Sequence, residues 1–176
     1  MINIKILDAT CGFKGIWFQK NNPLVTFMDN RNITFKSTHK NQKPRTYVIK
    51  PDIVSNWEDT PFPDNYFDMV VFDPPHLIRK RKTVESTMMK QYGYLYESDY
   101  KVKLKNGIRK LFDVLKNDGV FVFKWNDSDK SINEVLPLFP FKPLFGTQIG
   151  QRTNTYWIVF IKHRLEQELD INYKEV

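Results

Sequence analysis

Short apolar runs alternate with polar or amphipathic segments along this chain of 176 residues. Apolar runs bounded by turn residues predict buried strands, and their alternation with helices or loops is typical of an α/β domain with a mostly parallel sheet. We expect seven strands, at Ile4–Thr10, Val25–Met28, Asp52–Ser55, Phe67–Phe72, Val120–Trp125, Leu144–Ile149 and Tyr156–Ile161.

Helical periodicity is clearest at Tyr100–Lys116, where apolar residues recur on one face until Asn117-Asp118-Gly119 ends the helix. Shorter helices are expected at Ile16–Lys20 and Ser131–Leu138, and residues 30–50 have a weak helical pattern. Residues 77–97 have no clean period and predict a long functional loop with some helix.

The last two expected strands are separated by a polar turn at Gly150–Asn154, which suggests an antiparallel hairpin, and the charged tail from Arg164 suggests one or two helical turns. The predicted architecture is therefore a Rossmann-like α/β fold, in which helices cover both faces of a seven-stranded, mostly parallel sheet. No linker divides the chain, so we expect a single domain over residues 1–176.

Composition indicates the class of protein and its cellular compartment. The chain is 41% hydrophobic and 15% aromatic, which indicates a folded globule with a real core. No apolar run approaches the ~18 residues that a membrane-spanning helix needs, and the N-terminus has no cleavable signal pattern. The one cysteine, Cys11, cannot form an internal disulfide, which fits a reducing compartment. We expect a cytoplasmic protein without membrane contact.

Positive charge is concentrated in one window. The net charge is +7, and residues 77–110 alone hold ten Lys/Arg against three Asp/Glu, so this window also sums to +7. A local basic excess is typical of a surface that binds a polyanion such as nucleic acid. A solvated lysine-rich face would have the same composition, and the charge pattern leaves both readings open.

Asp73-Pro74-Pro75-His76 directly follows the apolar run Met69–Phe72. Proline has no backbone N–H to donate, so the predicted strand ends there and leaves bare carbonyls beside an acid and a planar ring. Such a cluster suits an exocyclic amine, whose two N–H groups would donate to Asp73 and a carbonyl while the ring stacks on the base. An Asp-Pro-Pro sequence by itself also commonly forms a turn.

The first expected strand leads into a tight loop that contains Gly12 and Gly15, and Asp29 ends the next strand. Ligands of open α/β sheets bind outside the carboxyl ends of the strands, and an acid about 20 residues after the first strand suits a ribose diol. The loop is not a GxGxxG, and an ordinary βα turn also explains its glycines.

The order of these motifs along the chain resembles that of a class I S-adenosylmethionine-dependent methyltransferase. The first strand leads into the Asp8 loop, the second ends at Asp29, the third is followed by Asn56-Trp57, and the fourth is followed by Asp73. Asp73–His76 is similar to the D/N-P-P-Y/F/W motif of the amino-methyltransferases that make N6-methyladenine or N4-methylcytosine. The whole length is similar to small phage- and mobile-element-type methyltransferases.

The resemblance implies S-adenosylmethionine as cofactor and a role for each matching residue. The implied cofactor-binding residues are Asp8, Thr10, Cys11, Gly12, Phe13, Gly15, Asp29, Asn56, Trp57 and Asp73. The implied catalytic residues, which would hold the methyl-accepting amine and its ring, are Asp73, Pro74, Pro75 and His76. This chain has Asn56 where an aspartate is usual and His76 where the family has Tyr, Phe or Trp.

Arg79-Lys80-Arg81-Lys82 follows the motif and precedes Tyr92, so basic and aromatic groups lie close in sequence. These types suit phosphate contact and base stacking, and we expect residues 77–100 to form the substrate loop or lid, with a mobile surface loop as the alternative. The chain has no spacing of His and Cys typical of a metal site, and no base is spaced to activate Cys11 as a nucleophile.

The favoured function is methyl transfer to a base amine of nucleic acid, with DNA favoured over RNA and adenine N6 as the acceptor. The alternatives are methylation of structured RNA, methylation of a protein glutamine, or a non-catalytic cofactor-binding subunit. No helix precedes the first strand, so one side of the cofactor pocket is expected to be open or closed by a partner, either a second copy or another subunit. We expect the side chains of Asp8, Asp29, Asn56 and Asp73 to converge in one cleft.

Overall fold

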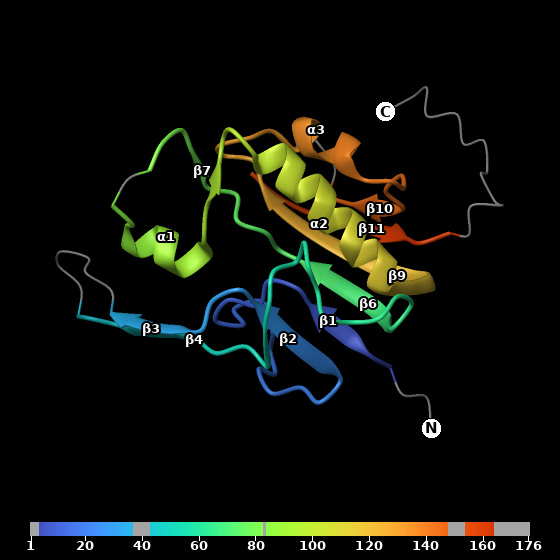
Figure 1. Cartoon of the computed structure of the whole chain (residues 1–176), viewed down its shortest axis with the longest axis horizontal. Helices are drawn as coiled ribbons and strands as arrows, with labels where there is room; N and C mark the ends of the chain where they lie inside the picture. The colour runs from blue at the N-terminus through green and yellow to red at the C-terminus, as the bar shows by residue number, and fades with distance from the viewer. Residues whose placement is uncertain (1–3, 37–42, 83, 148–153, 164–176) are drawn as a thin grey trace.

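A seven-stranded sheet runs through the centre of the protein (Figure 1). The computed structural model describes residues 4–36, 43–82, 84–147 and 154–163. The strand order across the sheet is β10-β11-β9-β6-β1-β2-β5, and β11 is antiparallel to β9 and β10. The strands are β1 (Ile6–Asp8), β2 (Val25–Asp29), β5 (Ile53–Val54), β6 (Phe67–Phe72), β9 (Leu115–Asn126), β10 (Phe145–Gly146) and β11 (Thr155–Ile161). The predicted seven-stranded, mostly parallel sheet with a C-terminal antiparallel hairpin strand is confirmed.

The remaining elements are short, apart from one helix. Two small two-stranded sheets are formed by β3 (Ile33–Lys36) with β4 (Thr46–Ile49) and by β7 (Ile78–Arg79) with β8 (Leu95–Tyr96). The helices are α1 (Thr87–Tyr92), α2 (Tyr100–Val114), α3 (Ile132–Val135) and the 3₁₀ turn η1 (Leu136–Leu138). None of the helices in the described ranges is long and apolar enough to span a bilayer.

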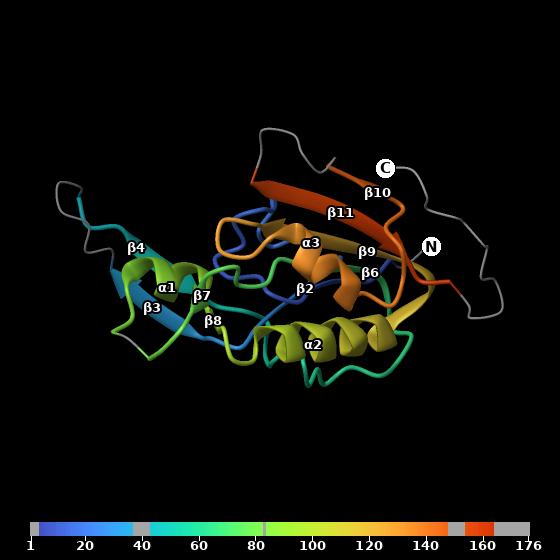
Figure 2. The same ribbon diagram turned by 90° about the horizontal axis from the view of Figure 1, so that it is seen from above.

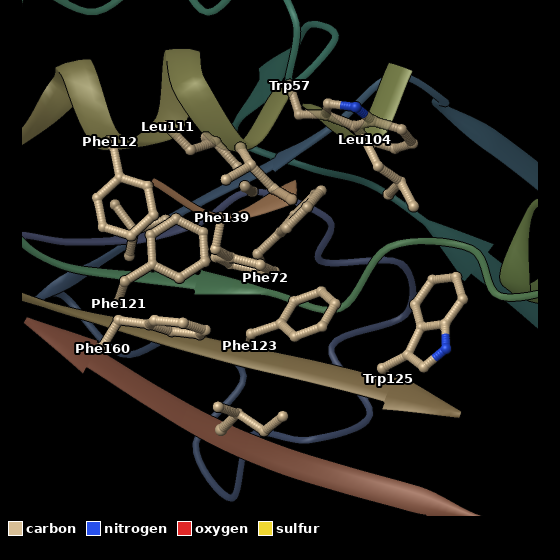
Figure 3. Close-up of a cluster of buried hydrophobic side chains, with 14 of the residues drawn as sticks. Trp57, Phe72, Leu104, Leu111, Phe112, Phe121, Phe123, Trp125, Phe139 and Phe160 are labelled. Carbon is tan, nitrogen blue, oxygen red and sulfur yellow. The ribbon is translucent and has the colours of Figure 1, made fainter. Parts of the chain in front are cut away.

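One face of the sheet carries the main core, under α2, α3 and η1 (Figures 2 and 3). Alternate residues of β9 point to this face, and Phe121 stacks on Phe112 of α2 at 4.5 Å between ring centroids. Phe139 stacks on Phe160 of β11 at 4.3 Å. The alternation along β9 and the helical spacing along α2 are the patterns that sequence periodicity predicts, and both elements are present. The predicted end of the helix is wrong, because α2 ends at Val114 and Asn117-Asp118-Gly119 lie within β9.

The opposite face is covered differently from the expectation that helices lie on both faces. In the described residues its cluster consists of Cys11, Val25 and Phe27, with Trp17 packed against it from the loop after β1. The predicted helix at Ile16–Lys20 is wrong, because these residues form turns. Lys14, which precedes this segment, has a φ of +58°, outside the helical region, and a segment of five residues has too few hydrogen bonds to form a stable helix.

The weak helical expectation for residues 30–50 is also wrong. Residues 33–36 and 46–49 form the antiparallel pair β3–β4, in which Phe35 lies opposite Tyr47 and their rings stack at 5.4 Å. β-branched and aromatic residues at these positions favour strands, and cross-strand aromatic pairs stabilise them. The pair projects from the body of the protein on the side where α1 lies (Figures 1 and 2).

Residues 77–97 form β7, α1 and β8, which fits the expected long segment with some helix. Ser131–Leu138 contains α3 and η1, so this helical expectation is also confirmed. The predicted helical turns of the tail from Arg164, and most of the Gly150–Asn154 turn, lie outside the described residues.

Candidate functional site at the carboxyl edge of the sheet

Four polar side chains follow the carboxyl ends of neighbouring strands. Asp8 ends β1, Asp29 ends β2, Asn56 follows β5 and Asp73 follows β6. Because β6, β1, β2 and β5 are adjacent and parallel, these four ends lie along one edge of the sheet.

The larger of two adjoining cavities at this edge has a volume of about 660 Å³ and is called the wide cavity here. Its walls come from the strand ends and from residues 85–96 of the loop segment. The residues that line it are Ala9, Thr10, Asp29, Asn30, Arg31, Ile33, Asn56, Trp57, Glu58, Asp73, Pro75, Glu85, Met89, Lys90, Tyr92, Gly93, Tyr94, Leu95, Tyr96 and Lys103.

The smaller cavity has a volume of about 260 Å³ and is called the narrow cavity. Four residues, Thr10, Arg31, Asp73 and Tyr92, line both cavities, so the two are continuous. The other residues that line the narrow cavity are Asp8, Cys11, Gly12, Phe13, Gly15, Ile16, Pro74, His76, Gln91 and Lys124. Asp29, Asn56 and Asp73 line the wide cavity, and Asp8 and Asp73 line the narrow one, so the four side chains border two adjoining cavities rather than the single cleft that was expected.

Asp29 is buried, and its carboxylate accepts four hydrogen bonds. Gly12 N donates to Oδ2 at 2.9 Å, and Arg31 donates through its backbone N, Nε and Nη2 at 2.8–3.0 Å. The same guanidinium donates to the carbonyl of Lys90 in α1 at 3.1 Å. Arg31 therefore links the β2 strand end to the loop segment above the cavities, a role that sequence reasoning missed.

Asp8 is 1% exposed and has two hydrogen-bond donors. Trp17 Nε1 donates to Oδ2 at 2.6 Å, and the Thr10 amide donates to Oδ1 at 3.1 Å. Burial raises the pKa of Asp8 to about 7, although both hydrogen bonds act in the opposite direction. The narrow cavity therefore contains a carboxyl group that titrates near neutral pH.

Asp73 forms an ion pair with Lys124, whose Nζ lies 2.6 Å from Oδ2. Both side chains are 24% exposed, and the Asp73 amide donates to Thr10 Oγ1 at 2.9 Å. Burial raises the pKa of Asp73, while the Lys124 ammonium works against the rise. Within the described chain, Lys124 engages only one of the two carboxylate oxygens, so Oδ1 remains available as an acceptor.

Lys124 was absent from the predicted site, although a signal for it exists. It interrupts the apolar run Val120–Trp125, on the face opposite Phe123 and Trp125. Phe72 pairs with Phe123 between the parallel strands β6 and β9, so Asp73 and Lys124 are the next residues in register. Only the register, which the sequence does not specify, brings them together.

His76 lies beside Tyr92, with 6.4 Å between the ring centroids and 44° between the planes. Burial lowers the pKa of His76, and the neighbouring Asp73 carboxylate partly offsets that effect. A neutral imidazole therefore predominates at pH 7. The two rings form an aromatic wall of the narrow cavity.

Trp57 is 8% exposed, and its ring packs edge-on against Phe72 at 5.6 Å. Its indole N–H has no hydrogen-bond acceptor among the described residues, which is unusual for a buried donor. Asn56 Oδ1 accepts from Asn30 Nδ2 at 3.0 Å. Glu58, which sequence reasoning also missed, lines the same wall, and burial raises its pKa.

The loop segment borders both cavities as predicted, mainly through residues 89–96. Tyr92 lines both cavities, but Arg79, Lys80, Arg81 and Lys82 line neither of them. Arg79 lies in β7, and the next three residues are exposed. Of the predicted substrate-binding residues, the structure brings Tyr92 alone to the cavities.

Cys11 is buried, and burial raises the pKa of its thiol, which favours the unreactive protonated form. Among the described residues, no group of three or more His, Cys, Asp or Glu side chains is arranged to hold a metal ion. The chemistry available at this edge is therefore that of carboxylates, bare carbonyls, lysine and arginine cations and aromatic rings.

Comparison with solved structures shows the fold. The PH0226 protein from Pyrococcus horikoshii OT3 superimposes with a TM-score of 0.57 at 15% identity, over 90% of this chain and 81% of that one. A SAM-dependent methyltransferase of the DUF858 family from Leishmania major gives a TM-score of 0.51 at 12% identity, over 90% of this chain and 66% of that one, just under two thirds. No protein-family model matches the chain, and neither does any curated protein.

Proposed function

We propose that the protein transfers a methyl group from S-adenosylmethionine to an exocyclic amine of a nucleic-acid base, with adenine N6 in DNA as the favoured acceptor. One observation carries the proposal: Asp73, the first residue of the Asp-Pro-Pro-His motif, lies where the wide and narrow cavities join. A group-transfer enzyme needs such a junction, because donor and acceptor must meet at one point.

The residues of the wide cavity fit the adenosine part of the cofactor. Asn56 provides an amide, and Trp57 provides a flat ring edge and a buried N–H that has no acceptor among the described residues. Asp29 would bind the ribose hydroxyls in place of the Arg31 side-chain donors, so Arg31 would have to leave Asp29. The fold shared with the Leishmania major methyltransferase supports the same assignment.

When bound, the cofactor supplies a methyl group on a positively charged sulfur. Asp8 and the Thr10–Gly15 loop line the narrow cavity, where a buried carboxylate would stabilise that charge. Asp73 Oδ1 and the Pro74 carbonyl would accept the two N–H groups of the base, which turns the nitrogen lone pair toward the methyl group. His76 and Tyr92 would contact the flat faces of the base, and a base within a duplex must be flipped out to reach them.

Lys124 would act as a positioning residue. Its ammonium holds Asp73 Oδ2 at 2.6 Å, which fixes the orientation of the carboxylate and favours its ionised form. An ionised Asp73 can accept both a hydrogen bond from Lys124 and one from the amine. Most of the acceleration would then come from held geometry, which can replace several kcal/mol of lost freedom.

The test measures transfer of a labelled methyl group from S-adenosylmethionine to separate pools of DNA, RNA and protein. We expect label in DNA, recovered as N6-methyladenine and lost in Asp73→Ala. Asp68→Ala is the matched control, because Asp68 lies on the same strand away from the cavities and also pairs with a lysine, Lys116. If the label appeared in RNA or protein instead, the acceptor would belong to that pool and not to DNA. Tight cofactor binding without transfer to any pool would indicate a non-catalytic subunit.

A further inference from the structure

A third hollow, called the basic groove here, lies between the β3–β4 pair and the loop after β1, and has a volume of about 710 Å³. It holds four basic side chains and no acidic one. Its lining residues are Gly12, Phe13, Lys14, Gly15, Lys20, Arg45, Thr46, Tyr47, Val48, Lys50, Gln91 and Tyr92. The wide cavity differs, because it mixes acidic and basic side chains.

Within the described ranges, no carboxylate pairs with the positive charges of this groove. In the described part of the chain, none of Lys14, Lys20, Arg45 and Lys50 forms a salt bridge. Two of them lie over aromatic rings instead: Lys14 Nζ is 3.8 Å from the Phe27 ring centroid, and the Arg45 guanidinium carbon is 5.7 Å from that of Tyr47. Uncompensated positive charge around a hollow attracts a polyanion.

Aromatic rings line the same groove. Phe13 meets Tyr47 on one side and Tyr92 on the other, each at 6.0 Å between ring centroids, and Tyr92 is 45% exposed. A lysine-rich face that served solubility alone would need no such rings. Basic side chains that follow a backbone, together with rings on which bases stack, are the usual means of binding single-stranded nucleic acid.

The groove continues into the site already described. Gly12, Phe13, Gly15, Gln91 and Tyr92 line both the basic groove and the narrow cavity. A strand that lay in the groove would therefore pass directly beside the ring wall of His76 and Tyr92. The basic segment Arg79–Lys82, which the charge pattern favoured, does not line the groove.

We propose that the basic groove binds a single strand of DNA next to the target nucleotide, with phosphates on Lys20, Arg45 and Lys50 and a base on Tyr47. The identity of the target base rests on the proposed function, but binding of the strand does not. In this proposal the β3–β4 pair is a substrate-holding element, formed by residues 33–36 and 46–49 of a region that had a weak helical pattern.

The first experiment compares two double variants that remove equal charge from exposed positions. Lys20→Ala/Arg45→Ala removes two groove charges, and Lys105→Ala/Arg109→Ala removes two from the exposed side of α2. Binding of a labelled DNA single strand of about 12 nucleotides, within the usual site size, is measured by anisotropy at several salt concentrations. The logarithm of the binding constant falls linearly with the logarithm of the salt concentration. Each lost phosphate contact should make this slope shallower by about 0.7, so we expect the slope of the groove variant to be shallower by about 1.4.

That change corresponds to a loss of about 25-fold in affinity at 0.1 M salt, and the control should lose at most a small fraction of it. Equal losses in the two variants would overturn the proposal, because the effect would then be one of net charge. Groove-dependent binding of an RNA strand with none of DNA would overturn the choice of DNA.

A second experiment tests the ring. Tyr47→Leu should weaken strand binding about tenfold, because one stacked base is worth about 1–3 kcal/mol, whereas Tyr47→Phe should keep wild-type affinity. Unchanged binding in Tyr47→Leu would overturn the stacking role. In methyl-transfer assays the groove variants should raise KM for DNA and leave kcat unchanged.

The two proposals fail in different ways. If the wild-type protein binds the strand through the groove but transfers no methyl group to DNA, the proposed function fails and the groove inference stands. If it methylates DNA and the groove variants behave as the control does, the groove inference fails and the function stands.

Discussion

The aromatic core under α2 and the polar carboxyl edge share strands, but they are stabilised in different ways. In the core, Phe112, Phe121, Phe139 and Phe160 are buried and contact one another as stacked or edge-on rings. Here the favourable free energy comes from removing apolar surface from water and from close packing. No side chain of this group has to be charged or paired.

At the carboxyl edge the same strands end in buried carboxyl groups, and burial of a charge costs free energy unless partners compensate. Asp29 has four hydrogen-bond donors, whereas Asp8 has two and a pKa raised to about 7. The edge is therefore a place where stability depends on pH, and the core is not. The difference indicates that the edge is shaped for a ligand at the expense of stability.

Removal of a core ring should have the largest effect. Phe121→Ala deletes a fully buried ring with four aromatic neighbours, and we expect unfolding to cost about 3–5 kcal/mol less, measured in urea. Phe18→Ala is the control, because Phe18 is fully exposed and should change stability very little. A small loss in Phe121→Ala would mean that the rings repack and that the core is less specific than the stacking suggests.

Asp8→Asn should change how stability depends on pH. The pKa of Asp8 is about 7 in the folded state, raised from 3.8. Its contribution to the free energy of unfolding is therefore fully present below pH 4 and is lost as the pH rises toward 7. Between pH 5 and pH 8 the free energy of unfolding of the wild type, measured in urea, should therefore fall by about 2–3 kcal/mol more than that of Asp8→Asn. The pKa of Asp68 is lowered by Lys116, so Asp68→Asn should leave this pH range unchanged. Parallel curves for wild type and Asp8→Asn would contradict the raised pKa.

Lys124→Met tests the ion pair at the junction of the cavities. Without the ammonium, the main effect that opposes burial is lost, so the pKa of Asp73 rises further and its ionised form is less favoured. Methyl transfer should fall by up to about a hundredfold, the usual cost of a misplaced reacting group, and should recover toward alkaline pH. Lys116→Met breaks a similar pair on the same two strands and is the control. A loss without a shift of the pH profile would mean that Lys124 acts in another way.

Gly107→Ala tests the contact between α2, which covers the core, and Trp57, which lies at the carboxyl edge. A Cβ at this position of α2 would lie 2.6 Å from Trp57 Nε1, so the indole would have to move. Overpacking costs about 1–3 kcal/mol, whereas alanine gains about 1 kcal/mol over glycine within a helix, so the net loss should be about 0–2 kcal/mol. If the proposed function holds, affinity for S-adenosylmethionine should fall as well, because Trp57 lines the wide cavity. Asn106→Ala, at an exposed neighbouring position, should change neither property.

The core could be predicted from the sequence better than the edge could. The pattern of β6, β9 and α2 depends on apolar periodicity, which is local, and the convergence of the strand ends follows once the strands are parallel. The β3–β4 pair was missed because lysine, asparagine and threonine obscure its alternation. Lys124 and Arg31 were missed because their partners depend on register and turn geometry, which no local pattern encodes.

The smallest expected effect concerns the charge of the proposed cofactor. S-adenosylmethionine has a positive sulfur, whereas its product S-adenosylhomocysteine does not, and a cation beside Asp8 favours the ionised carboxylate. Below pH 7 Asp8 is mostly protonated, so the affinity ratio of the two ligands should rise by up to about tenfold from pH 5.5 to 7.5 and then level off. Calorimetric titration measures both affinities, and Asp8→Asn should make the ratio independent of pH. A constant ratio in the wild type would place the sulfur away from Asp8 and would separate the narrow cavity from methyl transfer.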